Sequence, residues 1–89
     1  MRLILNVTLS GVSADHTVEF DAEPRDEDVK RLAVELVRSG DIPGLHVAGL
    51  SDRAFDDYVV DRFDTPEGGR RLFLRPKVPF GGEPSAASR

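Results

Sequence analysis

Cysteine is absent from the 89 residues of this chain. Its absence excludes disulfide bonds, thiolate metal sites and a thiol nucleophile. Long apolar runs are missing too: no stretch approaches the roughly eighteen residues that a membrane span requires, and the apolar start of the chain turns polar at Asn6, too early for a signal peptide. We therefore expect one small cytoplasmic domain, without a membrane partner, whose apolar core holds it together unaided.

Basic side chains are outnumbered by acidic ones, and lysine is rare. The chain has 12 basic against 16 acidic side chains and a net charge of -4, which argues against non-specific nucleic-acid binding because such binding depends on neutralising phosphates. Arginine supplies all the basic side chains except Lys30 and Lys77, and with many Ala, Asp and Gly this usage indicates a GC-rich, bacterial coding bias. The proportions of hydrophobic (39%) and charged (31%) residues are typical of a compact domain.

Two segments near the start of the chain alternate with a period of two, which predicts strands with one buried face. The first carries its apolar residues at odd positions, Leu3, Leu5, Val7 and Leu9. The second carries them at Val18, Phe20 and Ala22, and residues 10–15 between the two segments are typical of a turn or loop. We therefore expect a hairpin with both apolar faces on one side.

The next segment has the period of a helix. Its apolar residues follow the i, i+3, i+4, i+7, i+8 spacing of one helix face: Val29, Leu32, Ala33, Leu36 and Val37. Acidic residues 26–28 stand at the start of the helix, where the helix dipole is positive, and Arg38 stands near its end, where the dipole is negative. Gly40 is a suitable C-terminal glycine and Pro43 prevents continuation, so this helix should pack its apolar stripe against the hairpin.

After the helix the pattern is weaker. Residues 45–48 form a candidate short strand, and residues 52–60 a loop or helical turn that sends Phe55, Tyr58 and Val59 toward the core. Residues 64–69 are typical of a turn. Residues 71–75 predict the last strand, which Pro76 ends because proline cannot donate to a sheet ladder. The expected fold class is α+β, a mixed sheet with one main helix on one face, over a domain spanning residues 1–75.

A diglycine, Gly81-Gly82, stands close to the end of the chain, on a tail (residues 76–82) stiffened by Pro76 and Pro79. Seven residues, 83–89, follow it. One interpretation is a flexible terminus, since ends rich in proline, glycine and serine are common. The other is a carboxyl terminus that is exposed when residues 83–89 are removed.

Other candidate sites have structural explanations. The acidic pair Asp56-Asp57 and the acidic run 26–28 are more often turns and helix starts than catalytic acids. His16 and His46 lack the ligand spacing of a metal site. The ring of Tyr58 is expected at the edge of the core, with its hydroxyl hydrogen-bonded to a loop. We therefore expect no catalytic residue, no metal, no cofactor and no enzyme activity in the chain itself.

Six short motifs lie before, within and after the helix and at the end of the tail: Glu23-Pro24 with Asp26, Val29-Lys30, Ile42-Pro43, Leu45-His46-Val47-Ala48-Gly49, Asp57-Tyr58 and Gly81-Gly82. In their order and spacing these motifs resemble those of ubiquitin and the ubiquitin-like family. This resemblance implies the β-grasp fold and a bacterial protein modifier that is joined to other proteins.

The departures from ubiquitin are also specific. The first hairpin is about five residues longer, and the tail is about two residues longer and carries prolines. His46 and Arg75 stand where the family has the aliphatic residues that ubiquitin receptors grip, so ordinary ubiquitin receptors should not be assumed to bind. Most acceptor lysines of ubiquitin have no counterpart, which makes linkage-coded chains doubtful.

The resemblance implies the following chemistry. A peptidase cuts between Gly82 and Glu83, an adenylating activating enzyme uses ATP to activate the Gly82 carboxylate, and a cysteine-bearing carrier enzyme passes the acyl group to amines on target proteins. Gly81 threads the partner's tunnel. The recognition tail is Arg75, Pro76, Lys77, Val78, Pro79 and Phe80.

A zinc metallopeptidase is one candidate for the implied maturation or deconjugating peptidase. Related bacterial systems suggest antiphage defence as a role. Lys77, and less favourably the partly covered Lys30, are candidate self-acceptors. Two alternatives stay open. A β-grasp sulfur carrier would carry a C-terminal thiocarboxylate, and a non-conjugated ubiquitin-like binding module would not need residues 81–89.

Overall fold

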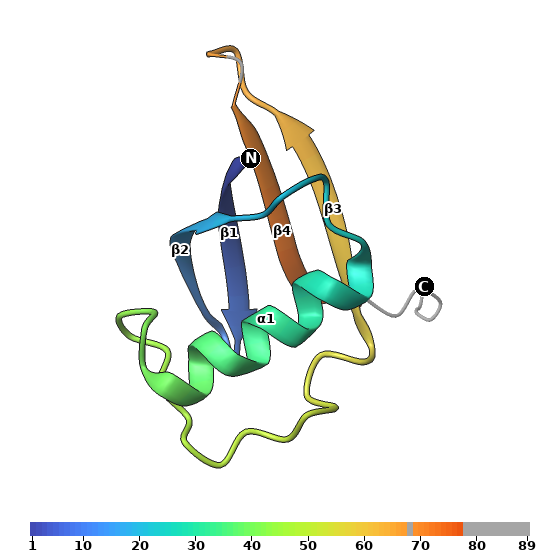
Figure 1. The fold of residues 1–89 in the computed structure, drawn as a ribbon. Coiled ribbons are helices and arrows are strands. Elements are labelled where there is room, and N and C mark those ends of the chain that lie inside the picture. Colours follow the sequence, from blue (N-terminus) through green and yellow to red (C-terminus); the bar gives the residue numbers. More distant parts are fainter. Residues whose placement is uncertain (68, 78–89) are drawn as a thin grey trace, which may run out of the picture.

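The computed structural model describes residues 1–67 and 69–77 as an α+β domain. Its elements follow in the order β1 (Arg2–Leu9), β2 (Val12–Glu19), α1 (Asp26–Ser39), β3 (Tyr58–Asp64) and β4 (Arg70–Pro76). Figure 1 shows α1 lying across one face of the sheet. The fold is therefore the expected mixed sheet with one helix on one face, an arrangement compatible with the β-grasp fold.

The four strands are arranged in the order β2-β1-β4-β3. β1 runs parallel to β4, and the two outer pairings are antiparallel. The predicted alternation of β1 is confirmed, because Leu3, Leu5 and Val7 are buried under the helix. Leu72 and Leu74 of β4 are fully buried on the same face, opposite Leu5 and Val7 in the register. The face turned away from the helix, the open face, carries the intervening residues of each strand.

The first hairpin is tighter than the sequence predicts. Ser10 (φ 52°) and Gly11 (φ 80°) form a two-residue turn between the strands. Positive φ at both central residues is typical of the type I′ turn, whose twist matches that of the strands. The predicted loop over residues 10–15 is therefore wrong, since pairing resumes at Val12. β2 also ends at Glu19, so that Phe20 and Ala22 lie in the connection to the helix and not in the strand.

The helix confirms its prediction. It begins at Asp26, and Gly40 ends it in the left-handed conformation (φ 80°), with its backbone N–H donating to the Leu36 carbonyl. The buried residues are Val29, Ala33, Val34 and Val37. Leu32 and Leu36 of the expected stripe are only partly buried, and Val34, outside that stripe, is buried in their place.

The segment after the helix differs most from the prediction. Residues 45–48 form no strand: the backbone N–H of Val47 donates to the Val37 carbonyl at 3.1 Å, which holds this segment against the end of α1 instead of in the sheet. Ile42, Leu45 and Phe55 are buried and attach the segment to the core. The third strand is β3, part of which was predicted as loop.

The side chains of β3 that face the core are not all those that the sequence predicts. Val60 and Tyr58 are half-buried and pack against the core, whereas Val59 is 38% exposed on the open face. The expectation that Val59 enters the core is therefore wrong, and the reason is the period of two in a strand. No helix within residues 1–67 and 69–77 has the length and apolar character needed to cross a membrane.

Candidate functional site

The candidate site lies where the C-terminal tail leaves the sheet. Of the predicted tail residues, Arg75 and Pro76 are the last residues of β4, and Lys77 follows them as an exposed residue. The remaining predicted site residues, Val78, Pro79, Phe80, Gly81, Gly82 and Glu83, lie outside the described part of the chain. The geometry of the site is accordingly that of the root of the tail.

The tail begins at a central strand of the sheet. β4 is paired with β1 on one side and with β3 on the other, and Pro76 lies opposite Tyr58. Proline is compatible with this position because the hydrogen-bonded pairs of the β3–β4 ladder fall on the odd-numbered residues of β4, and the pairing of β4 with β1 ends at Leu74, so neither ladder requires an N–H at Pro76. Pairing with β1 up to Leu74 and with β3 up to Pro76 therefore fixes the direction in which the chain leaves the domain.

A hollow of about 350 Å³ lies at this exit, lined by Asp57, Tyr58, Pro76 and Lys77. The Tyr58 ring forms its main aromatic wall and packs edge-on against the buried Phe55, with ring centroids 4.7 Å apart. Partial burial raises the pKa of Tyr58 above its ordinary value, so the phenol stays neutral at physiological pH. The predicted place of the Tyr58 ring at the edge of the core is confirmed, but within residues 1–67 and 69–77 its hydroxyl makes none of the expected hydrogen bonds to a loop.

Arg75 is held on the open face. Its guanidinium donates to the Asp61 carboxylate on β3, the strand next to it. The ion pair joins neighbouring strands on a partly exposed face, where its contribution to stability is small. It does fix the orientation of the last side chain before the proline.

The two lysines have different environments. The ammonium group of Lys30, a half-buried residue of α1, donates to the Asp56 carbonyl at 3.2 Å. Lys30 lines a groove of about 460 Å³ between the helix and the 52–56 segment, together with Glu27, Arg31, Val34, Glu35, Asp52, Phe55 and Asp56. Lys77 is exposed beside the tail. The predicted partial covering of Lys30 is confirmed.

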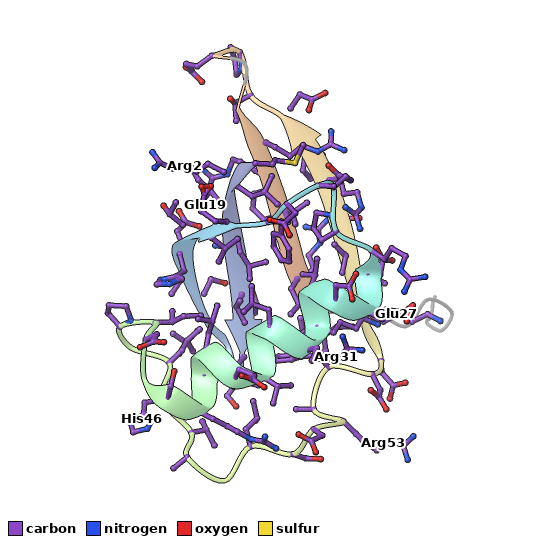
Figure 2. The ribbon with its side chains drawn as sticks, in the orientation of Figure 1. Arg2, Glu19, Glu27, Arg31, His46 and Arg53 are labelled. Atoms are coloured by element: carbon purple, nitrogen blue, oxygen red, sulfur yellow. The ribbon has the colours of Figure 1, made fainter. Side chains whose placement is uncertain are left out.

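The acidic run at the start of α1 and His46 make structural contacts. Asp26 pairs with Arg62, and Asp28 with Arg25 and Arg31, at the start of α1. His46 lies in the loop beyond the other end of α1 (Figure 2), with its ring against Gly40 and its Nε2 3.1 Å from the Arg38 carbonyl oxygen. Across residues 1–67 and 69–77, no group of three or more His, Asp or Glu side chains is arranged to hold a metal ion.

A network of charged side chains connects the start of the helix to the β3–β4 hairpin. Glu23 accepts hydrogen bonds from both Arg70 and Arg62, and these two arginines also bond to Asp64 and Asp26 respectively. The hydrogen bond from Arg70, followed by that from Arg62, holds the pKa of Glu23 below its ordinary value. On the open face, hydrogen bonds from Asn6 and then Arg71 lower the pKa of Asp15.

These lowered pKa values predict how stability depends on pH. A carboxyl group whose pKa is lower in the folded state stabilises the protein above its unfolded pKa, and this contribution is lost as the pH falls through the folded pKa. We expect the urea midpoint of unfolding to be flat above about pH 5 and to fall below about pH 4. In the double variant Glu23→Gln, Asp15→Asn the urea midpoint should fall less steeply at acidic pH. A fall as steep as in the parent would contradict the lowered pKa values of Glu23 and Asp15.

Sequence reasoning missed the aromatic pair on the open face. Phe63 of β3 and Phe73 of β4 are packed edge-on with centroids 5.4 Å apart, and the Arg71 guanidinium lies 5.4 Å from the centre of the Phe73 ring. The signal was present: Val59, Asp61 and Phe63 alternate with residues that face the core, in a segment rich in β-branched and aromatic residues.

Comparisons of the chain with protein-family models, with curated proteins and with solved structures find no match.

Proposed function

We propose that the chain is the precursor of a bacterial ubiquitin-like protein modifier, cut after Gly82 and joined to target amines through the Gly82 carboxylate. The observation that supports this proposal is the place of the tail root. β4 is a central strand, and its last residue leads out of the domain beside Tyr58. A diglycine six residues beyond Pro76 would be carried outward from a rigid base, as an acyl donor that must enter a partner's active site requires.

The chemistry needs partners, because this chain supplies the acyl group and not the catalytic side chains. A carboxylate is a poor acyl donor, so an activating enzyme joins Gly82 to AMP, using ATP and releasing pyrophosphate. A partner cysteine displaces AMP to form a thioester, and a target amine displaces that thiol to form an amide. Gly81 and Gly82 suit this role because they lack a Cβ. Residues 75–80 would provide recognition.

Lys77 is the lysine that we propose for any self-modification. Its side chain is exposed beside the tail, whereas the Lys30 ammonium is engaged with the Asp56 carbonyl and lies within the helix groove. An amine must be free and neutral to attack a thioester. Lys30 therefore serves as an internal comparison, because both lysines belong to the same chain.

A sulfur carrier is the second candidate. One observation removes a reason for preferring the modifier to the sulfur carrier. The segment 45–49, which resembles a strand of ubiquitin in sequence, is not part of the sheet. One element of the likeness to ubiquitin is therefore missing. In a sulfur carrier the adenylated carboxylate would become a thiocarboxylate, and no isopeptide bond would form.

Intact-mass and digest analysis of the protein from its native cells tests the proposal. A modifier should yield a species ending at Gly82 and diglycine remnants on target lysines. A C-terminal oxygen replaced by sulfur would transfer the assignment to the sulfur carrier. If every molecule keeps Arg89 and no adduct is found, both reactions of the carboxyl group are ruled out, and a non-conjugated binding module becomes the explanation.

A further inference from the structure

β3 is one of the two edge strands, and its backbone hydrogen-bonding pattern can be deduced. The Thr65 N–H donates to the Gly69 carbonyl at 2.9 Å, which makes residues 65 and 69 a hydrogen-bonded pair. Such pairs alternate along an antiparallel ladder, so Phe63, Asp61 and Val59 bond to β4. The N–H and carbonyl groups of Val60, Arg62 and Asp64 therefore point away from β4. These outward groups form what we call the β3 edge.

The β3 edge is open in the described part of the chain. Tyr58, at the start of β3, turns its N–H to the Phe55 carbonyl at 3.0 Å, but no hydrogen bond within residues 1–67 and 69–77 engages the outward groups of Val60, Arg62 or Asp64. Figure 1 shows β3 at the side of the sheet, with β4 as its strand neighbour. An edge of this kind can accept another strand.

The side chains beside the β3 edge favour binding. Val59 and Phe63 are 38% and 49% exposed on the open face, on either side of Asp61. Phe63 is held by its edge-on contact with Phe73, so its exposed surface has a fixed orientation. Val59 and Phe63 each lie two positions from Asp61, so a strand added here could place apolar side chains opposite both of them.

The opposite edge of the sheet, β2, has the features of a protected edge. Met1 and Phe20 form a hydrogen-bonded pair, because the Met1 amine donates to the Phe20 carbonyl and the Phe20 N–H donates to the Met1 carbonyl. Such pairs alternate along the β1–β2 ladder, so the outward backbone groups of β2 are those of residues 13, 15, 17 and 19. Their side chains are Ser13, Asp15, Thr17 and Glu19. Figure 2 shows Glu19 beside Arg2, its partner in the register. Polar and charged side chains along an edge discourage strand pairing. β3 carries charged residues as well, but on its open face Asp61 is flanked by the exposed apolar side chains of Val59 and Phe63.

Charge determines the kind of strand that fits the β3 edge. Three arginines near β3 (Arg62, Arg70 and Arg75) pair with four carboxylates (Glu23, Asp26, Asp61 and Asp64), which leaves one negative charge in excess, while Asp57 and Lys77 beside them offset each other. The neighbourhood is therefore acidic. A basic side chain opposite Asp61 would complement it, whereas an acidic one would be repelled.

We propose that the β3 edge binds an extended segment of a partner protein as an added strand, and that this segment carries a basic residue with an apolar residue two positions away on each side. The outward backbone groups supply affinity, while Val59, Asp61 and Phe63 select the side chains. The apolar–basic–apolar pattern is symmetric, so it fits in either strand direction. The proposal is independent of the diglycine, since no part of it involves the tail.

A short peptide can serve as the probe. We would use a capped peptide matched to the 7 residues of β3, with valine, lysine and valine at its second, fourth and sixth positions and threonine elsewhere. Titrated into the full-length protein, it should shift the backbone amide resonances of Val60, Arg62 and Asp64 more than those of residues 13–19. The same peptide N-methylated at every residue should not bind in either strand direction.

Two variants and one matched control test the edge itself. Val60→Pro removes an outward N–H while leaving the β3–β4 ladder intact, and should weaken binding roughly tenfold. Thr17→Pro makes the same change on the β2 edge and should leave binding unchanged. If Val60→Pro does not fold, Asp61→Lys provides the test: it should weaken binding of the lysine peptide and strengthen that of a glutamate version.

Three results would overturn the proposal: equal binding of the N-methylated peptide, shifts centred on β2, or unchanged affinity in Asp61→Lys. Sedimentation of the protein alone adds a fourth. If two copies pair through β3 and the peptide cannot compete, the edge is a self-association surface and the proposed partner segment is wrong.

Discussion

Replacing Phe55 with alanine is expected to lower the free energy of unfolding by about 3–5 kcal/mol. Phe55 is 1% exposed, and its large side chain belongs to a segment between α1 and β3 that contains no helix or strand. Such a segment contributes few ladder hydrogen bonds of its own. Its attachment depends on its buried side chains, which are Ile42, Leu45 and Phe55.

The expected loss is large compared with the stability of the whole domain. Small domains unfold with free energies toward the low end of about 5–15 kcal/mol, so Phe55→Ala should leave a measurable fraction unfolded in water. The loss of the Phe55 ring also removes the edge-on support of Tyr58 and therefore loosens the wall of the hollow at the tail root. Urea unfolding followed by far-UV circular dichroism would measure the change.

Phe63→Ala is the matched control for Phe55→Ala. The same atoms are removed, but Phe63 is 49% exposed on the open face, so we expect a loss of about 1 kcal/mol or less. If Phe55→Ala were no more costly than Phe63→Ala, the 40–57 segment would not be anchored as the structure indicates.

The elements that sequence reasoning predicted well are those with a strong local period. β1 has four apolar residues at alternate positions, and α1 has a continuous apolar stripe with acidic residues at its start and Gly40 at its end. The last strand, with Leu72 and Leu74 on one face, was predicted for the same reason. In these elements local propensity and the final fold favour the same structure.

The third strand could not be predicted in the same way because two segments competed for one place in the sheet. Residues 45–48 and Tyr58–Asp64 both have β-forming residues, and only one can pair with β4. The bond from the Val47 N–H to the Val37 carbonyl fixes the first segment at the end of the helix. Local propensity does not distinguish the two segments, and tertiary contacts determine which of them forms the third strand.

The surroundings of the tail were predictable only in part. The sequence indicates Pro76 and Lys77 as the start of a tail, but it cannot show that Tyr58 forms the wall beside them. The hydrogen bonds that join Glu23 and Asp26 to Arg62 and Arg70 connect residues 36 to 47 positions apart in the chain, so spacing along the sequence gives no sign of them. The β3 edge depends on the strand order and on which backbone groups point outward, and both are properties of the folded sheet.

Replacing Gly81 and Gly82 together with alanine is expected to lower conjugation by about a hundredfold, if the chain acts as the proposed modifier. The added Cβ atoms would widen the end of the tail and displace the carboxylate from the position that adenylation requires, and misplacement of about 1 Å at a reacting centre can cost that factor. The domain itself should be unaffected because the substitutions lie beyond β4. Immunoblots of tagged protein expressed in its source cells would report adducts of higher mass.

Gly49→Ala is the matched control for the diglycine variant. An added Cβ at Gly49 meets no atom within 4 Å and Gly49 has no positive φ, so alanine should be accepted there without effect on adducts. The urea midpoints of both variants should equal that of the parent, which separates loss of conjugation from loss of the fold. Adducts that persist at the parental level in the Gly81→Ala, Gly82→Ala variant would contradict the role of Gly82 as acyl donor. Peptide binding at the β3 edge would be unchanged in that case, because the two proposals depend on different parts of the chain.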